Sequence, residues 1–298
     1  MFIGYFGAED TPLNRGFGRK TLLAAVRRAR RPGCKFDCMP VIEAPQGAGK
    51  SRAVRALAVM DDNFSDQPIR WDDPKQQLEA VSGTWIYEVG ELVGLKKADV
   101  ENVKNFLSRQ EDKVRPAYGR YVVTRPRRCI FIGTVNGGID AGYLTDPSGA
   151  RRFWPVRAGR IEVEAIERDR DQLWAEAAAI EARGESLELD PALYEAARVQ
   201  QELRRAPDPW KDILAGVEGD LADGPHGKIE RITTAKLLEG CLRLAASQMT
   251  RTTYIRLATV MRSLGWDGPK DIRFSEKSKN EREGGRVVKG YERPAGAT

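Results

Sequence analysis

A glycine-bearing loop between a short apolar stretch and a helical pattern is the feature that most constrains this chain. Residues 39–55 read MPVIEAPQGAGKSRAVR. In a loop of this kind, backbone N–H groups surround the β- and γ-phosphates of a nucleoside triphosphate. The lysine adds a mobile positive charge, and the serine hydroxyl is a ligand for Mg²⁺. The sequence therefore predicts contacts with ATP from Pro45, Gln46, Gly47, Ala48, Gly49, Lys50, Ser51 and Arg52.

The residues on either side of the loop favour this interpretation. Residues 39–42 are compact and apolar, as in a buried strand, and residues 51–60 place Val54 and Leu57 at helical spacing. Ala44 stands where the strict motif has glycine, which the turn tolerates if the φ angle of Ala44 stays negative. The alternative is a structural glycine-rich turn before a helix.

A second apolar run ends in two carboxylates three residues apart. Residues 83–91, GTWIYEVGE, predict a buried strand with Glu88 and Glu91 at its end. Glu88 is expected to hold a metal-bound water, so that Ser51 and Glu88 form a magnesium site. Glu91 is expected to orient the attacking water as a general base. The alternative is a pair of surface acids.

A third apolar run, residues 129–136 (CIFIGTVN), ends in an amide. Asn136 at a strand tip can hydrogen-bond both the γ-phosphate and the attacking water, so we assign it as a sensor. A turn asparagine before Gly137 and Gly138 fits the local sequence equally well.

An arginine pair follows a turn in residues 146–156, DPSGARRFWPV. Arg151 and Arg152 lie before an aromatic–proline pair, where they can project toward the phosphates of a neighbouring subunit. An arginine that acts in this way raises turnover by roughly 10³ to 10⁵. The alternative is that one arginine pairs with a local acid and the other is solvated.

Together these segments resemble the virulence-associated protein E family. The resemblance spans about Gly18 to Leu187 and is carried by the strings EAPQGAGKS, GTWIYEVGEL, NVKNFLSRQEDKVRPAYGR, CIFIGTVN, DPSGARRFWPV and RDQLWAEA. It implies a P-loop ATPase of phages and mobile elements, similar to the superfamily-three viral replication helicases. Such proteins assemble as rings, so a homo-oligomer, with six subunits expected, is implied as well.

Carried over by position, the resemblance implies catalytic roles for Lys50, Glu88, Glu91, Asn136, Arg151 and Arg152. It places Arg115 and Arg120 at family motif positions in RPAYGR. Ala44 departs from the family's usual glycine. The primase-like module that many relatives carry upstream is missing, so a separate primase is an expected partner.

Basic residues are concentrated in two tracts. The net charge of +6 alone suggests a mild preference for polyanions. Residues 15–35 contain eight basic residues and no acid, and residues 114–128 contain five and no acid. Either tract could bind DNA, weakly at high salt, or form a solubilising face. In the second tract, DNA contacts are predicted for Arg115, Arg120, Arg125, Arg127 and Arg128.

The cysteines do not form a metal signature. Cys34 and Cys38 lack a matching second pair, and the only histidine is His226. Free thiols in a reducing cytosol are expected. No apolar run approaches the ~18 residues of a membrane helix, so we expect a soluble, cytoplasmic protein without a membrane partner.

The predicted organisation is an α/β P-loop NTPase of AAA+-like type with a helical lid, followed by a winged-helix-like domain. Residues 1–17 are read as an irregular lead-in, and residues 18–210 as the ATPase domain, with a parallel sheet between helices. Residues 19–31 form the first expected helix, and VRPAYGRYVVTRPRR a hairpin that contacts nucleic acid in the ring channel. The expected lid helices are residues 168–183 and 190–205, and the domain boundary lies in residues 216–227.

Residues 228–298 follow the order helix, helix, strand, loop, strand, which is typical of a winged helix. The second helix, residues 250–264, would enter a DNA groove through Arg251, Thr252, Thr253 and Arg256. Lys277, Lys279 and Arg282 would touch phosphates from the wing. The alternative is a domain that packs on protein or organises the ring.

The leading hypothesis is an ATP-driven DNA translocase or helicase of phage or mobile-element replication that acts as a ring. The alternative is an ATP-gated DNA-binding initiator or regulatory module without unwinding activity. A small-molecule P-loop kinase leaves the basic tracts and the winged-helix pattern unexplained.

Overall fold

The computed structural model describes residues 1–90, 92, 97–115, 120–137, 142–144, 149–206, 208–225, 227–273 and 287–296. The chain divides into two compact units, residues 1–206 and residues 207–298. This division falls earlier than the predicted boundary. The helix α8 (Pro209–Ala215) and the strand β8 (Asp220–Gly224) therefore belong to the second unit.

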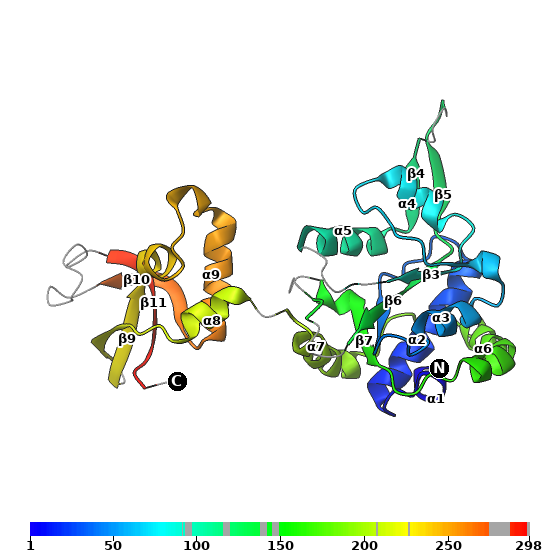
Figure 1. The fold of residues 1–298 in the computed structure, drawn as a ribbon, viewed down its shortest axis with the longest axis horizontal. Helices are drawn as coiled ribbons and strands as arrows, with labels where there is room; N and C mark the ends of the chain where they lie inside the picture. Colours follow the sequence, from blue (N-terminus) through cyan, green and yellow to red (C-terminus); the bar gives the residue numbers. More distant parts are fainter. Residues whose placement is uncertain are drawn as a thin grey trace. The chain divides into compact units, whose positions relative to one another are not determined.

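A five-stranded parallel sheet forms the middle layer of the first unit, in the order β2-β3-β6-β1-β7 (Figure 1). Its strands are β1 (Met39–Ala44), β2 (Phe64–Ser65), β3 (Ile86–Val89), β6 (Ile130–Asn136) and β7 (Phe153–Arg157). Because the strands run in one direction, the carboxyl ends of β1, β3 and β6 meet at one edge of the sheet. The predicted α/β class with a parallel sheet is confirmed.

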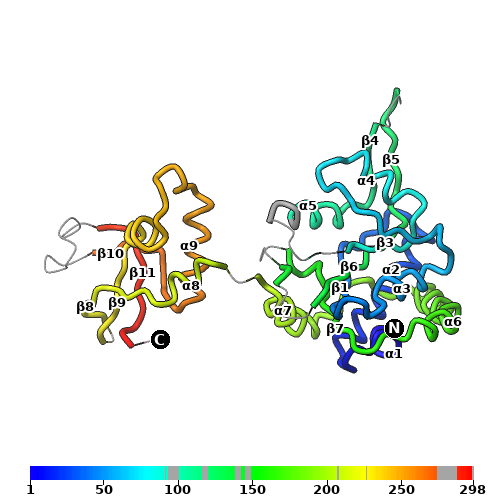
Figure 2. The backbone as a smooth tube through the Cα atoms, in the orientation of Figure 1, coloured from blue at the N-terminus to red at the C-terminus, as the bar shows by residue number. Residues whose placement is uncertain are grey.

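Successive side chains of the strands point into two different apolar layers, as the pleat of a strand requires. Ile42 and Ile132 belong to one buried cluster, and their neighbours Val41 and Phe131 belong to the other. The first cluster is covered by α1 (Phe2–Phe6), α2 (Pro12–Arg30), α3 (Lys50–Leu57) and α6 (Val163–Ala182). The second is covered by α4 (Pro74–Val81) and α5 (Lys97–Ser108), which gives three layers (Figure 2).

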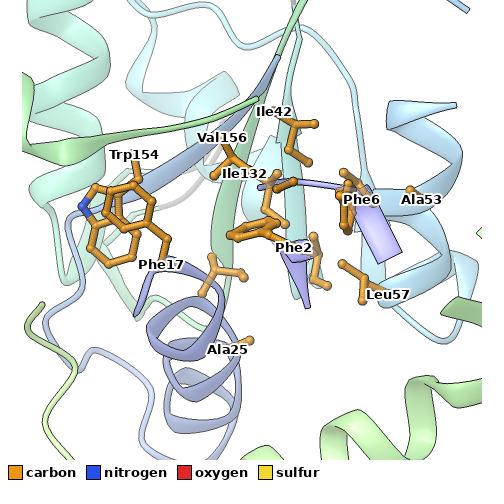
Figure 3. Close-up of a cluster of buried hydrophobic side chains, with 14 of the residues drawn as sticks. Phe2, Phe6, Phe17, Ala25, Ile42, Ala53, Leu57, Ile132, Trp154 and Val156 are labelled. Atoms are coloured by element: carbon orange, nitrogen blue, oxygen red, sulfur yellow. The ribbon is translucent and has the colours of Figure 1, made fainter. Parts of the chain in front are cut away.

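Residues 1–17, predicted to be an irregular lead-in, are part of the core. Phe2, Phe6 and Phe17 are fully buried, and the ring of Phe17 stacks on Trp154 with centroids 4.9 Å apart (Figure 3). Burial of one such side chain contributes about 1.5–3 kcal/mol. The prediction was wrong because the glycines of this segment obscured the helical spacing of its aromatic residues.

The helix α2 begins seven residues before the predicted start at Arg19. The hydroxyl of Thr11 accepts a 3.1 Å hydrogen bond from the N–H of Asn14, and Pro12 occupies the first helical position. Both are standard signals for a helix start.

The basic tract of residues 15–35 largely binds acids of its own chain. Glu185 accepts hydrogen bonds from Arg19 and Lys20, and Glu181 accepts them from Arg27 and Arg30. These two acids lie at and just beyond the end of α6. These ion pairs therefore hold α2 against α6. The tract is not the open polyanion-binding surface that the sequence suggested.

The two helices predicted to form a lid lie in different places. The indole of Trp174 and the guanidinium of Arg170, both on α6, donate to backbone carbonyls at the end of α3. The helix α7 (Tyr194–Leu203) packs against β7, and the two helices lie on opposite sides of the first unit in Figure 1. The lid prediction is therefore wrong for α6, which belongs to the helix layer of the core.

A two-stranded hairpin connects α5 to β6. The strands β4 (Glu111–Val114) and β5 (Val123–Pro126) pair antiparallel, with Glu111 opposite Pro126. The predicted hairpin is confirmed, although residues 116–119 lie outside the described part.

The second unit contains a four-stranded antiparallel sheet in the order β10-β11-β9-β8. Its other elements are β9 (Gly227–Thr233), a π-helical turn (Lys236–Cys241), α9 (Arg251–Ser263), β10 (Asp267–Arg273) and β11 (Val287–Pro294). The helix α9 and the last two strands match the prediction, but β8 lies within the predicted boundary of residues 216–227 and β9 follows it, where no strand was predicted. Lys277, Lys279 and Arg282 of the expected wing lie outside the described residues.

Candidate functional site

The residues between β1 and α3 form a tight loop at the carboxyl edge of the sheet. Gly47 and Gly49 have φ angles of 79° and 86°, values that glycine adopts without strain. Within the described chain, the non-glycine residues with positive φ are Val59 and Arg243. Ala44 therefore meets the condition under which the loop tolerates an alanine.

The ammonium group of Lys50 is held by three oxygens. It donates 2.9 Å hydrogen bonds to the carbonyls of Ala44 and Pro45 and to the side-chain oxygen of Asn136. Burial lowers the pKa of Lys50, and the nearby Glu88 carboxylate opposes this shift. The lysine thus bridges the loop to the tip of β6 while its charge is only partly compensated.

Glu88 lies buried at the end of β3 beside Ser51. Its Oε1 atom accepts hydrogen bonds from the hydroxyls of Ser51 (2.8 Å) and Thr134 (2.7 Å). Its Oε2 atom is buried, and among the described residues it has no hydrogen-bond partner. A buried carboxylate oxygen without a partner is costly unless a cation, a water or a proton satisfies it. The site therefore presents one oxygen that is ready for an additional group.

An open cavity of about 750 Å³ runs from the loop across the end of β3. Lys50, Ser51, Glu88 and Asn136 line it, together with Asp66 and Trp71. This volume lies within the range of cavities that hold small molecules and cofactors. Within the described chain, no group of three or more acidic, cysteine or histidine residues could alone hold a metal.

The structure brings Lys50, Ser51, Glu88 and Asn136 together, as the sequence predicted. The fifth residue of this set, Glu91, lies outside the described residues. Thr134, whose hydroxyl fixes the Glu88 carboxylate, was not predicted from the sequence. A polar residue inside the apolar run CIFIGTVN, two positions before Asn136 and thus on the same face of the strand, was the available signal.

The arginine pair has two different environments. Arg152 is half-buried and contacts Asp37 (3.4 Å) and the Ser108 hydroxyl (3.0 Å), whereas Arg151 is exposed. Both residues precede β7, and Phe153 at the start of β7 lies opposite Met39 at the start of β1. The pair therefore sits at the amino edge of the sheet, away from the loop of its own chain.

The predicted nucleic-acid residues of the hairpin region separate into exposed and buried ones. Arg115, Arg120, Arg125 and Arg128 are exposed, as are the apolar side chains of Tyr121 and Val122. Arg127 is buried, forms a two-fold contact with the Asp112 carboxylate (2.7 and 2.8 Å) and lies over the Phe106 ring. Arg127 is thus a structural residue, and we withdraw it from the predicted DNA contacts.

In the second unit, Arg251 is exposed at the start of α9. Arg256 binds both oxygens of Asp208 (2.7 and 2.9 Å) and lies over the Trp210 ring, so it holds α8 against α9.

All four cysteines are free, and burial raises the pKa of Cys38 to about 12. Such a thiol stays protonated, which is consistent with a structural role.

Fold and site together define a three-layer α/β protein with a loop, a lysine and a buried carboxylate at the carboxyl edge of its sheet. The model of the virulence-associated protein E-like domain matches residues 1–206. The chain belongs to this family, as the sequence resemblance indicated. No curated protein matches it in sequence.

Solved structures of similar fold extend over both units. An apo structure of the NrS-1 C-terminal region (305–718) has a TM-score of 0.56 at 13% identity and covers 97% of this chain and 73% of that one. The A form of the same region has a TM-score of 0.51 at 12% identity, with the same coverage. Among the described residues, none of the helices has the length and apolar composition needed to cross a bilayer.

Proposed function

We propose that the chain is a Mg²⁺-dependent ATPase of phage or mobile-element replication that moves along DNA as a homo-oligomeric ring, with six subunits expected. The observation that carries this proposal is the set of bonds from Lys50 to two loop carbonyls and to Asn136, next to the Ser51–Glu88 contact. These contacts gather a cation, a hydroxyl, a carboxylate and an amide around the glycine-bearing loop, which are the groups that a P-loop site would need.

Each of these residues would have a distinct task toward a bound triphosphate. The backbone N–H groups of residues 46–49 would surround the β-phosphate, and Lys50 would exchange its carbonyl partners for phosphate oxygens. Asn136 would hold the γ-phosphate and the attacking water, while Glu91 would accept a proton from that water. Binding would thus replace bonds that the site already makes.

The buried oxygen of Glu88 fits a magnesium ion. Ser51 and Glu88 would hold the ion directly or through water, and the remaining ligands would be phosphates and waters, as is usual for Mg²⁺. When bound, the ion would neutralise the charge that develops on the phosphates.

The position of Arg151 supports a site shared between subunits. Six residues of β1 separate the amino edge of the sheet, where Arg151 lies, from the loop. At about 3.3 Å per residue this separation is roughly 20 Å, which exceeds the reach of an arginine side chain. An arginine that stabilises the transferred phosphate would therefore come from a neighbouring chain.

Exposed basic residues beside exposed Tyr121 support DNA contact by the hairpin. Arg120 and Arg125 would bind backbone phosphates, and Tyr121 offers a ring for base stacking. Arg251 of α9 would add a contact from the second unit.

The test is Mg²⁺-dependent ATP turnover, with and without single-stranded DNA. Lys50→Ala is expected to lose hydrolysis, whereas Lys75→Ala, at an exposed position on α4, keeps it. A mixture of Lys50→Ala and Arg151→Ala chains is expected to recover part of the activity, because it contains sites with both an intact loop and an intact arginine. A folded, associated mixture without turnover would exclude shared sites.

Strand displacement separates this proposal from a DNA-binding switch. ATP-dependent unwinding supports the motor. Nucleotide-dependent DNA binding without unwinding would favour the ATP-gated initiator or regulatory module.

A further inference from the structure

The central strand of the sheet, β6, sends two polar side chains to the candidate site. It lies between β3 and β1 and pairs with both, so its position is fixed from two sides (Figure 2). Thr134 and Asn136 are two residues apart on β6 and therefore point to the same face of the sheet. Asn136 accepts a hydrogen bond from Lys50, which follows β1, whereas Thr134 donates one to Glu88 on β3. One strand thus holds a group from each of its two neighbours.

Thr134 is held by the sheet. Its side chain is 5% exposed, and its hydroxyl donates a 2.7 Å hydrogen bond to Oε1 of Glu88. In the backbone, Thr134 lies opposite Ile42 of β1. The hydroxyl therefore has a fixed position that does not depend on the glycine-bearing loop.

The other donor to Glu88 is Ser51, in the first turn of α3 directly after the loop. Ser51 is exposed and, in the proposed function, would itself bind the metal ion. Its oxygen would then turn toward the ion, and its bond to Glu88 would be weakened. Thr134 has no such second task, so it would keep its bond to Glu88 when the ion is present.

The orientation of a carboxylate depends on bonds of this kind. The last torsion of a glutamate side chain has only a broad two-fold preference, so the group turns easily unless a partner holds it. In Glu88 the bond to Thr134 holds Oε1. Oε2 stays buried and has no hydrogen-bond partner among the described residues. The hydroxyl of Thr134 therefore fixes the plane in which the free oxygen lies.

We propose that Thr134 is a positioning residue for the metal ion of the site: its hydroxyl holds the Glu88 carboxylate at the angle at which the free oxygen binds Mg²⁺ or one of its waters. A residue that touches a metal ligand, and not the metal, typically contributes about 10–100-fold in metal affinity or activity. This inference rests on the proposed function, because that function supplies the ion. It does not depend on DNA or on a ring.

Nucleotide binding with and without the ion tests this role without turnover. The full chain is titrated with a fluorescent, non-hydrolysable ATP analogue, once with saturating Mg²⁺ and once with EDTA. The ratio of the two affinities, here called the Mg²⁺ gain, isolates the contribution of the ion. Thr134→Val keeps the shape of the side chain and removes the hydroxyl, so it should lower the Mg²⁺ gain by roughly tenfold or more and leave the affinity in EDTA unchanged. Thr134→Ser keeps the hydroxyl and should recover most of the gain.

Thr84→Val is the matched control. Thr84 is also buried, lies just before β3 at the other edge of the sheet, and donates to the carbonyl of Ala80. Both valine variants lose one buried hydrogen bond, so each should lower the melting temperature by a similar amount, roughly 2–4 °C. The Mg²⁺ gain should fall in Thr134→Val and stay at the wild-type value in Thr84→Val.

Turnover provides a second readout. Thr134→Val should need more Mg²⁺ for half-maximal ATP hydrolysis and should regain activity at high Mg²⁺. A lower kcat at saturating Mg²⁺, with an unchanged Mg²⁺ dependence, would place Thr134 in the chemical step and overturn the inference.

The outcomes separate this inference from the proposed function. If Thr134→Val keeps the wild-type Mg²⁺ gain while Lys50→Ala loses hydrolysis, Thr134 only packs at the strand end and the proposed ATPase stands. If Thr134→Ser is as weak as Thr134→Val, or if Thr84→Val loses the gain as well, the hydroxyl is not the cause and the inference fails. A wild type that binds the analogue equally well in Mg²⁺ and in EDTA overturns both the metal site and the role of Thr134.

Discussion

Replacement of Arg204 by methionine should destabilise the first unit strongly. Arg204 donates hydrogen bonds of 2.6 and 2.7 Å to the two oxygens of Glu43, and the exposures of the two side chains are 2% and 0%. The Tyr143 hydroxyl donates a third bond to Glu43, at 2.9 Å. In Arg204→Met the buried Glu43 carboxylate keeps only the tyrosine.

The expected loss follows from the uncompensated charge. Removal of one partner of a buried ion pair costs about 3–5 kcal/mol. For a unit of about 200 residues, this loss corresponds to a melting temperature lower by roughly 6–20 °C. Differential scanning calorimetry of the full chain, with urea unfolding followed by tryptophan fluorescence, measures it.

Two variants show whether the charge is the cause. Arg198→Met removes an exposed arginine of α7, the helix that ends just before Arg204. Among its described contacts Arg198 pairs only with Glu195, so this change should alter the stability by less than about 0.5 kcal/mol. Glu43→Gln/Arg204→Met removes the unpaired charge and should recover part of the loss. If the double variant is as unstable as Arg204→Met, lost packing explains the effect and the charge argument fails.

Three further predictions concern other parts of the first unit. Arg151→Ala should lower kcat by roughly 10³-fold or more without a change in melting temperature. Arg152→Ala should instead lower the free energy of unfolding by about 1 kcal/mol. Turnover measurements and calorimetry of both variants separate the two roles. Arg125→Ala should make the slope of log affinity for single-stranded DNA against log salt shallower by about 0.7. Arg127→Ala should instead unfold the hairpin region, as hydrogen exchange would show. The Arg19 guanidinium, with Lys20, lowers the pKa of Glu185 to about 2, so this contact stabilises the protein above about pH 4.5 and is lost as the pH falls toward 2. Glu185→Gln should therefore flatten the loss of stability between pH 5 and 2, by roughly 1–2 kcal/mol after solvent screening; equal acid sensitivity in both proteins would contradict this assignment.

The polar groups at the strand ends could be predicted from the sequence because each follows an apolar run. Parallel strands bring their carboxyl ends to one edge, so the order of Lys50, Glu88 and Asn136 along the chain was enough to place them together. The same reasoning could not find the ion pairs. Whether Arg127 meets solvent depends on Asp112, which lies across a hairpin.

The helices that follow β7 show a second limit. The apolar spacing of α6 and α7 predicts helices correctly, but periodicity does not say which surface a helix covers. The hydrogen bond from Trp174 to the end of α3 shows that α6 belongs to the helix layer of the core. The sequence also contained a signal for the Glu43 ion pair that was not used. Glu43 is the one acid in the apolar run VIEAP, and an acid buried there needs a partner.

The stacking of Phe17 on Trp154 has a consequence for how the protein is made. Phe17 meets Trp154 only after β7 has been synthesised, so this part of the core closes across most of the first unit's length. Contacts of such long sequence separation slow folding. Until then the ring of Phe17 lacks the partner that covers it, and apolar surface exposed in this way during synthesis favours aggregation.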